Sequence, residues 1–343
     1  MKTSSITDRP LLHEVMSKSA GLNIPLQVAL ELTYRCNLRC AHCYIDITEK
    51  DELSFDEWRK ILDQLKAAGT LYLLLTGGEI SVRRDFLDIA AYARQNGFFL
   101  ALLTNCTMIT PSIARAIAGL KPLAVGTSLY GASAASHELV TKIPGSFHKT
   151  IEGIKLLVSA GVTPTVQVTS MKSNLDELPQ IEKLVAGLGA RVDITTGMAP
   201  SKTGAAFPFE YEPDCHELIE CGWQPDASSI PDNDRPQLCK AGKGICSVSP
   251  VGDVFPCIMF PMKLGSLKNS KFDEIWSLEP CAELRYLRLM RRSDLFACKT
   301  CTVKDYCQRC TGSAYLESGR TDGPSPSACR QAQIRWRLKN KEV

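Results

Sequence analysis

Hydrophobic and polar positions repeat one pattern between residues 25 and 196. A short apolar run is followed by a polar loop, and then by a longer segment whose apolar residues recur at helical spacing. The short runs predict strands at 26–32, 71–75, 98–103, 123–128, 163–169 and 192–196. The longer segments predict helices at 54–68, 83–96, 111–120, 146–160 and 175–188. The chain therefore begins with six strand–helix units.

Local signals support these elements. Ser54 followed by Glu57 forms a capping box, and Gly69, Gly97 and Gly161 stand where helices are expected to stop. Alternating strands and helices imply parallel strands with helical crossovers, so the fold class is α/β, either a doubly wound sheet or a complete or partial barrel.

The most distinctive peptides follow the predicted strands. Ligands of parallel α/β folds bind at the carboxyl ends of the strands, so these peptides are expected to share one rim. They are RCNLRCAHC, TGGE (76–79), TNC (104–106), SLYG (128–131), TSMKSN (169–174) and TGMAPSKTG (196–204).

The pattern changes after residue 204. Residues 205–238 are rich in proline and acidic residues and predict a connector, whereas residues 239–329 hold nine of the fifteen cysteines. The cysteine-rich segment has no strong periodicity, so we expect it to need a metal in order to fold.

Composition limits the classes of function. The 343-residue chain is 44% hydrophobic and 22% charged, with a net charge of +3, which is ordinary for a soluble globular protein and gives no reason to expect nucleic acid. It lacks a secretory signal or a membrane-spanning apolar stretch, so we expect a cytoplasmic protein without membrane attachment. Clustered cysteines in such a chain favour metal or cluster ligation over disulfides.

Cys36, Cys40 and Cys43 fall within eight residues directly after the first predicted strand. Structural zinc is almost always held by four protein ligands, although zinc or unrelated thiols remain the alternative. Three thiolates on a cubane iron–sulfur cluster leave one iron open for another ligand. The stretch CNLRCAHC resembles the Cys-x3-Cys-x-aromatic-Cys motif of the radical S-adenosylmethionine (SAM) superfamily.

This resemblance implies a partial (β/α)6 TIM-like barrel in which the three cysteines hold a 4Fe–4S cluster that binds SAM. TGGE resembles the family's GGE motif, which meets the ammonium group of SAM. The residues that the resemblance assigns to SAM are His42 near the adenine, Gly77, Gly78, Glu79, Asn105, Ser128 at the ribose, Lys172 at the carboxylate and Met198 at the adenine. Two of these residues could instead have no role in SAM binding: Lys172 could lie in solvent, and Met198 could pack in the core.

Cys106 departs from the family pattern, which usually has TNG where this chain has TNC. Its thiol could lie at the active-site rim and be a catalytic candidate. If the reaction is an epimerisation, the thiol would return a hydrogen atom to the product radical. A buried, inert cysteine is the other interpretation.

The C-terminal cysteines resemble the SPASM extension of radical SAM enzymes, which carries two auxiliary 4Fe–4S clusters. The resemblance implies a first set of Cys239, Cys246, Cys257 and Cys310, and a second set of Cys298, Cys301, Cys307 and Cys329. Cys307 and Cys310 stand closer together than the family pattern has them, so Cys281 is a possible substitute for Cys310. Two zinc sites are the alternative to the clusters.

The predicted organisation is an N-terminal extension (1–24), the radical SAM partial barrel (25–204), a connector (205–238), a small cysteine-rich SPASM domain (239–335) and a tail (336–343). The resemblance implies an enzyme that cleaves SAM and abstracts hydrogen from an unactivated C–H bond of a ribosomally made precursor peptide. It would crosslink, epimerise or excise part of that peptide.

The first 24 residues are too few for a leader-binding winged-helix domain, so we expect either that a separate leader-binding protein delivers the peptide or that no leader is involved. A flavodoxin- or ferredoxin-type protein would supply electrons. The alternatives are an enzyme acting on a sugar, a nucleoside or a tetrapyrrole side chain, and a non-enzymatic iron–sulfur carrier or sensor.

Overall fold

The computed structural model describes residues 10–48, 51–221, 238–277 and 279–340. One sheet runs through the described part, with the strand order β6-β5-β4-β3-β2-β1-β7-β8-β9. Its strands are β1 (Gln27–Thr33), β2 (Tyr72–Gly77), β3 (Phe99–Leu103), β4 (Ala124–Ser128), β5 (Thr165–Thr169), β6 (Arg191–Thr195), β7 (Ile245–Val248), β8 (Asp253–Phe255) and β9 (Gly265–Ser266).

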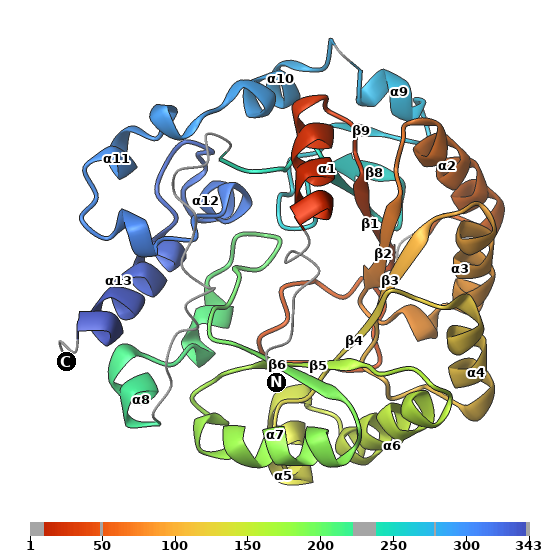
Figure 1. The fold of residues 1–343 in the computed structure, drawn as a ribbon, viewed down its shortest axis with the longest axis vertical. Coiled ribbons are helices and arrows are strands. Elements are labelled where there is room, and N and C mark those ends of the chain that lie inside the picture. The colour runs from red at the N-terminus through yellow and green to blue at the C-terminus, as the bar shows by residue number, and fades with distance from the viewer. Residues whose placement is uncertain (1–9, 49–50, 222–237, 278, 341–343) are drawn as a thin grey trace.

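The six N-terminal strands form the partial (β/α)6 barrel that the sequence predicts. Each of β1 to β6 is parallel to its neighbour in the sheet. Figure 1 shows α2 to α7 along the outer side of the curved sheet, whereas α1, which precedes β1, lies inside the ring. The helices are α1 (Pro10–Gly21), α2 (Phe55–Ala67), α3 (Phe86–Gln95), α4 (Pro111–Leu120), α5 (Ala134–Thr141), α6 (Ser146–Ser159) and α7 (Leu178–Gly187).

Helix α2 shows how local sequence fixes these elements. The Ser54 hydroxyl accepts a hydrogen bond from the Glu57 N–H (3.3 Å), and the Glu57 carboxylate accepts one from the Ser54 N–H (2.7 Å). This reciprocal cap satisfies N–H groups that have no partner within the helix. Trp58, Leu62 and Leu65, on one stripe of the helix, are buried against the sheet in the main core.

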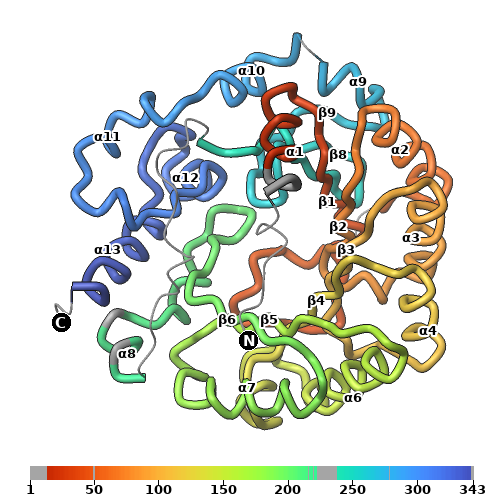
Figure 2. Tube along the Cα trace, in the orientation of Figure 1, coloured from red at the N-terminus to blue at the C-terminus, as the bar shows by residue number. Residues whose placement is uncertain are grey.

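The cysteine-rich part continues the barrel sheet. Strand β7 pairs in parallel with β1, placing Cys246 opposite Val28, and β8 and β9 follow as antiparallel strands. The chain can be followed in Figure 2 from β6 through the C-terminal helices, which occupy the part of the ring that the barrel leaves open. They are α8 (Cys215–Glu220), α9 (Phe272–Ile275), α10 (Ala282–Leu289), α11 (Phe296–Lys299), α12 (Thr311–Ser318) and α13 (Pro326–Asn340).

Polar contacts join the C-terminal part to the barrel at both ends. The Phe272 N–H donates to Oε1 of Gln64 on α2 (2.7 Å). On the opposite side, Gln331 of α13 donates to the buried Glu212 carboxylate (2.8 Å), which also accepts the N–H of Met198 (3.3 Å). None of the helices in the described ranges has both the length and the apolar character that a membrane span needs.

Candidate active site

A cavity of about 220 Å³ opens at the carboxyl ends of the barrel strands, where the sequence predicts a shared rim. Eight of the predicted site residues line it: Cys36, Cys40, His42, Cys43, Gly77, Gly78, Asn105 and Ser128. The three cysteines of the CNLRCAHC stretch and the residues of three further strand ends thus surround one hollow, although they are up to about ninety positions apart in the sequence.

The cysteine loop is held by backbone hydrogen bonds. The N–H groups of Arg39 and Ala41 donate to carbonyl groups at the end of helix α5 (3.0 and 2.9 Å). The N–H of Leu38 donates to Sγ of Cys36 (3.4 Å). These contacts fix the loop against α5 and leave the thiols directed toward the cavity.

Gly77 and Gly78 lie so close to the start of the cysteine loop that no side chain fits. Gly78 N–H donates to the carbonyl oxygen of Thr33 (2.8 Å), and the next N–H donates to that of Arg35 (2.9 Å). A Cβ atom on Gly77 would lie 2.2 Å from the Thr33 oxygen, and one on Gly78 would lie 2.3 Å from the Arg35 oxygen. The two glycines therefore allow β2 to brace the cysteine loop.

Glu79 is buried, with only 1% of its surface exposed, and it does not line the cavity. Its Oε1 accepts hydrogen bonds from the Ser81 N–H (3.0 Å) and the Thr104 hydroxyl (2.7 Å), and its Oε2 accepts the Asn105 N–H (2.6 Å). Through these hydrogen bonds the carboxylate connects the end of β2 to the end of β3. Its contact with SAM stays a prediction.

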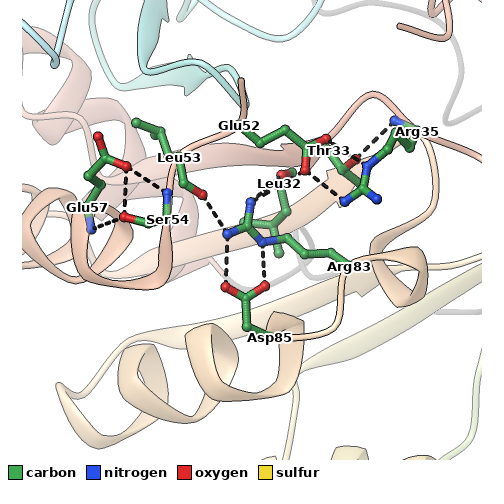
Figure 3. Close-up of polar contacts among 9 residues, drawn as sticks. All are labelled: Leu32, Thr33, Arg35, Glu52, Leu53, Ser54, Glu57, Arg83 and Asp85. Carbon is green, nitrogen blue, oxygen red and sulfur yellow. Dashed lines mark hydrogen bonds and ion pairs between the residues drawn. The ribbon is translucent and has the colours of Figure 1, made fainter. Parts of the chain in front are cut away.

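A second polar network supports the loop from outside, as Figure 3 shows. The Arg35 guanidinium pairs with the Glu52 carboxylate (2.9 Å). The buried Arg83 pairs with Asp85 (2.7 Å) and donates to the carbonyl groups of Leu32 (3.2 Å) and Leu53 (2.6 Å). The sequence analysis missed this network, because its members gather only when the loop folds back on β1.

Besides Glu79, three predicted site residues lie away from the cavity lining. The Cys106 thiol is fully buried in the main core, and burial raises its pKa to about 12. Cys106 also has a positive φ of 63°, which a glycine would adopt without strain. Lys172 is exposed, and the Met198 N–H donates a hydrogen bond to the Glu212 carboxylate. The roles predicted for these residues stay untested.

The cavity also contains residues that the sequence analysis did not assign. The rings of His42 and Tyr130 meet edge to face, with centroids 4.9 Å apart. His137 of α5 accepts the Tyr130 N–H at its Nδ1 (3.3 Å), and Gln167 of β5 completes the wall. Tyr130 belongs to the quoted SLYG peptide, so it could have been chosen from sequence. His137 lies on a helix that the hydrophobic pattern did not predict.

Burial makes the cavity histidines poor bases, and this predicts a pH dependence of folding. The pKa of His137 is lowered to about 4 by desolvation, whereas an unfolded histidine titrates near 6.5. The unfolded chain therefore binds the proton first, and stability falls as the pH drops from about 6.5 toward 4. Each pH unit in this window lowers the free energy of unfolding by about 1.4 kcal/mol.

Urea unfolding at pH 6.5 and pH 5 measures this effect. We expect the contribution of His137, about 2 kcal/mol over that interval, to vanish in His137→Asn. The exposed His148→Asn is the matched control. An equal pH dependence in both variants would show that His137 is not held neutral by the fold.

The first C-terminal cysteine set gathers beside the barrel. Burial raises the pKa of Cys257, and the thiols of Cys239 and Cys310 raise it further. Burial likewise raises the pKa of Cys246, with a further contribution from Cys257. Cys281 is exposed at the start of α10. This arrangement supports Cys310 over Cys281 as the fourth member of the first set.

The second set gathers around α13 and the turn before α12. Burial raises the pKa of Cys307, and Cys329, Cys298 and Cys301 raise it further. The Cys307 thiol also lies 4.0 Å from the carbonyl oxygen of Ala328, next to Cys329 in the chain. The largest thiol contributions therefore come from within the set that the sequence predicts.

Across the described ranges, no three His, Cys, Asp or Glu side chains converge as they would around a single metal ion. A four-iron cluster is larger than one ion and takes each thiolate on a different iron, so its ligands need not converge on one point.

Comparison with known proteins identifies the family. The model of the radical SAM superfamily matches residues 30–185, and the model of the SPASM iron–sulfur cluster-binding domain matches residues 239–311. An AdoMet-dependent heme synthase of Methanosarcina barkeri is 31% identical, covering 88% of this chain and 95% of that protein. This chain belongs to the radical SAM superfamily and carries a SPASM domain.

Other relatives share this two-part organisation. The mycofactocin maturase MftC of Mycolicibacterium smegmatis is 30% identical to this radical SAM protein. The alignment covers 94% of this chain and 87% of MftC. The crystal structure of Streptococcus suis SuiB bound to its precursor peptide SuiA has the same fold, with a TM-score of 0.71 at 15% identity, covering 96% of this chain and 82% of SuiB. The matched ranges lie within 25–204 and 239–335, whose exact bounds stay predictions.

As a radical SAM enzyme with a SPASM domain, the protein binds a 4Fe–4S cluster, SAM and auxiliary iron–sulfur clusters. The cavity fits the first two. Burial raises the pKa of all three loop thiols, to about 12 for Cys40, so these groups are neutral until iron displaces their protons. His42 Nδ1, Thr127 Oγ1 and His137 Nε2 are buried there without a hydrogen-bond partner in the described residues, which suits a polar ligand.

Proposed function

We propose that this enzyme modifies an unactivated C–H bond in a ribosomally made precursor peptide. The observation that carries the proposal is the similarity to the maturase MftC, which extends over both the barrel and the SPASM domain. SuiB supports it through the fold, because that structure holds a precursor peptide. A separate leader-binding protein and a flavodoxin- or ferredoxin-type electron donor are part of the same proposal.

Cys36, Cys40 and Cys43 are proposed to hold the SAM cluster. When bound, SAM and the reduced cluster supply a 5′-deoxyadenosyl radical that can remove a hydrogen atom from carbon. The chain's contribution is to fix the loop through Gly77 and Gly78 and to surround the site with His42 and other buried side chains. Side chains packed around a reactive species limit its side reactions with water.

The two C-terminal cysteine sets are proposed to hold two auxiliary 4Fe–4S clusters. Cys246 lies on β7 directly beside β1, so the first set is close to the barrel. The second set comes from α11, the segment that follows it, and α13. Four cysteines for each cluster leave no open iron, which favours electron transfer or structural support over direct binding of substrate.

A second candidate is a tetrapyrrole substrate whose side chain is modified. The observation that favours it is the 31% identity to an AdoMet-dependent heme synthase, of which the chain covers 95%. The chemistry at the barrel would be the same in both cases, so the nature of the substrate has to be tested directly.

Deuterium transfer separates these candidates. The reconstituted enzyme is given SAM and dithionite with either a deuterated precursor peptide or a tetrapyrrole deuterated in its side chains. We expect deuterium to appear in 5′-deoxyadenosine only with the peptide. Transfer only from the tetrapyrrole would overturn the peptide proposal. Because the precursor is not yet identified, the peptides used are those encoded beside the enzyme's own gene.

A further inference from the structure

The outer face of α10 carries apolar and basic side chains together. Leu284 and Leu287 are buried on one face of this helix, whereas Arg285, Tyr286 and Leu289 are exposed. Tyr286 is 48% exposed and Leu289 is 69% exposed. The outer face of an amphipathic surface helix normally holds polar residues only, so packing within the described part of the chain does not account for this apolar pair.

The exposed apolar surface continues into α11. Phe296 is 85% exposed, more than any other large hydrophobic side chain in the described ranges. The ammonium group of Lys299, three residues later on the same short helix, lies 5.9 Å from the centre of the Phe296 ring. Figure 1 shows α10 and α11 in succession on the outside of the ring. Exposed apolar groups with aromatic residues among them are typical of surfaces that contact another protein.

Charge is distributed unevenly along the chain. Residues 281–343 contain 13 of the 40 lysine and arginine residues but only 6 of the 37 acidic residues, so this segment is net +7 although the whole chain is net +3. Residues 282–305, which include α10 and α11, have six basic and three acidic side chains. The exposed apolar groups therefore lie in basic surroundings, and the partner that complements them is acidic around an apolar centre.

This surface is next to two cysteines in the chain. Phe296 precedes Cys298 by two residues, and Lys299 lies between Cys298 and Cys301. Consecutive Cα atoms are about 3.8 Å apart, so those of Phe296 and Cys298 are within about 8 Å of each other. A protein docked here would lie close to two cysteines proposed for the second auxiliary cluster. This position favours an electron-transfer partner over the precursor peptide, whose reacting carbon must reach the cavity at the barrel strand ends.

We propose that the outer face of α10 and α11 is the docking surface for an acidic electron-transfer protein of the flavodoxin or ferredoxin type. The inference rests on the electron donor and the second cysteine set of the proposed function. In the flavodoxin case, an anionic flavin hydroquinone loses one electron and becomes the neutral semiquinone, and an iron–sulfur cluster of this enzyme gains that electron. Encounters of this kind bury less than about 1,200 Å² in total, so a small patch is sufficient.

Binding of purified flavodoxin and, separately, of purified ferredoxin to the reconstituted enzyme tests this by isothermal titration calorimetry. We expect Arg285→Glu combined with Lys299→Glu to weaken donor binding about tenfold or more at low salt, and by less at high salt, because ions screen the charges. Lys149→Glu combined with Lys183→Glu is the matched control. It makes the same change of net charge at exposed positions of α6 and α7 and should leave donor binding unchanged.

Leu289→Ala separates apolar contact from charge. It should weaken donor binding severalfold at both salt concentrations, whereas Leu22→Ala, which removes a leucine of equal exposure (68%) next to α1, should not. The rate of SAM cleavage gives a second readout. With reduced flavodoxin the rate should fall in the Arg285→Glu/Lys299→Glu variant. With dithionite, a small reductant that needs no docking surface, it should match the wild type.

The proposal is overturned if the wild type binds neither donor, or if the control pair weakens binding as much as Arg285→Glu/Lys299→Glu. It is also overturned if the latter variant binds the donors normally and instead loses affinity for the precursor peptide or changes its sedimentation. The face would then serve the peptide or a second copy of this chain. The deuterium-transfer experiment uses dithionite and is independent of donor docking, so a failure of the proposed peptide modification would be seen there.

Discussion

The Gly78→Ala variant is expected to lose the SAM cluster and the cleavage of SAM that depends on it. The new Cβ would lie 2.3 Å from the carbonyl oxygen of Arg35 and 2.8 Å from its carbonyl carbon. Backbone atoms cannot rotate away as a flexible side chain can, so the cysteine loop or the end of β2 must move. A displacement of about 1 Å at such a site can reduce the rate about 100-fold.

The same clash should also reduce stability, by about 3 kcal/mol in the free energy of unfolding. Gly119→Ala is the matched control, because that glycine lies on α4 and its added Cβ would meet nothing within 4 Å. We expect the control to keep its iron and its rate of SAM cleavage. Equal iron content and equal cleavage in the two variants would show that the brace between β2 and the cysteine loop is unimportant.

Lys202→Met is expected to be the most destabilising change of a single charge. The Lys202 ammonium comes from the loop after β6 and pairs with the carboxylate of Glu31 on β1, whose side chain is 0% exposed. Glu31 also accepts a hydrogen bond from the Tyr34 hydroxyl (3.1 Å). Without Lys202, a buried carboxylate would lose its counter-charge, which typically costs about 3–5 kcal/mol.

Chemical denaturation of two further variants tests the origin of this effect. Glu31→Gln combined with Lys202→Met should recover part of the loss, because it removes the unpaired charge together with its partner. Lys263→Met breaks a more exposed pair with Asp253 (2.8 Å) and should cost less than about 1 kcal/mol. If Lys202→Met costs no more than Lys263→Met, the pair with Glu31 does not contribute to folding as proposed.

The sequence predicts the barrel well because its strands are buried runs and its helices are amphipathic. Each of the six predicted strands agrees with the structure to within two residues at either end. The largest errors among the predicted helices are the starts of α3 at Phe86 and α7 at Leu178, each three residues late, because a short 3-10 turn precedes each helix. The turn before α3, at residues 80–82, brings Arg83 to Asp85. That turn depends on side-chain contacts rather than on periodicity.

Elements of the cysteine-rich part escaped prediction for a different reason. Its strands have two to four residues, and most of its helices have four to eight, so no periodic pattern can develop. Strand β7 forms because the edge of β1 is available for pairing, which is a tertiary effect. In contrast, cysteine spacing does not depend on periodicity, and it carried the resemblance to the SPASM extension that implies the two cysteine sets. The division into these sets stays a prediction.

The candidate site was predictable from sequence where it is built from a distinctive motif, such as closely spaced cysteines or a pair of glycines after a strand. Cysteine spacing identified the loop, and the GGE motif singled out Gly77 and Gly78 as SAM contacts, although their role as a brace came only from the structure. His137 and Gln167 reach the cavity from elements that carry no distinctive motif. Cys106 shows the opposite limit. Its position after β3 left two interpretations, a thiol at the rim or a buried, inert cysteine, and the structure buries the thiol in the main core.

The most direct test of the three-cluster assignment is the iron and labile sulfide content per chain after anaerobic reconstitution. The wild type is compared with the Cys36/Cys40/Cys43→Ala variant. Three clusters predict roughly twelve irons in the wild type and roughly eight in the variant, each with matching sulfide. A wild-type content of only about four irons, with zinc bound elsewhere, would contradict the assignment of both C-terminal cysteine sets.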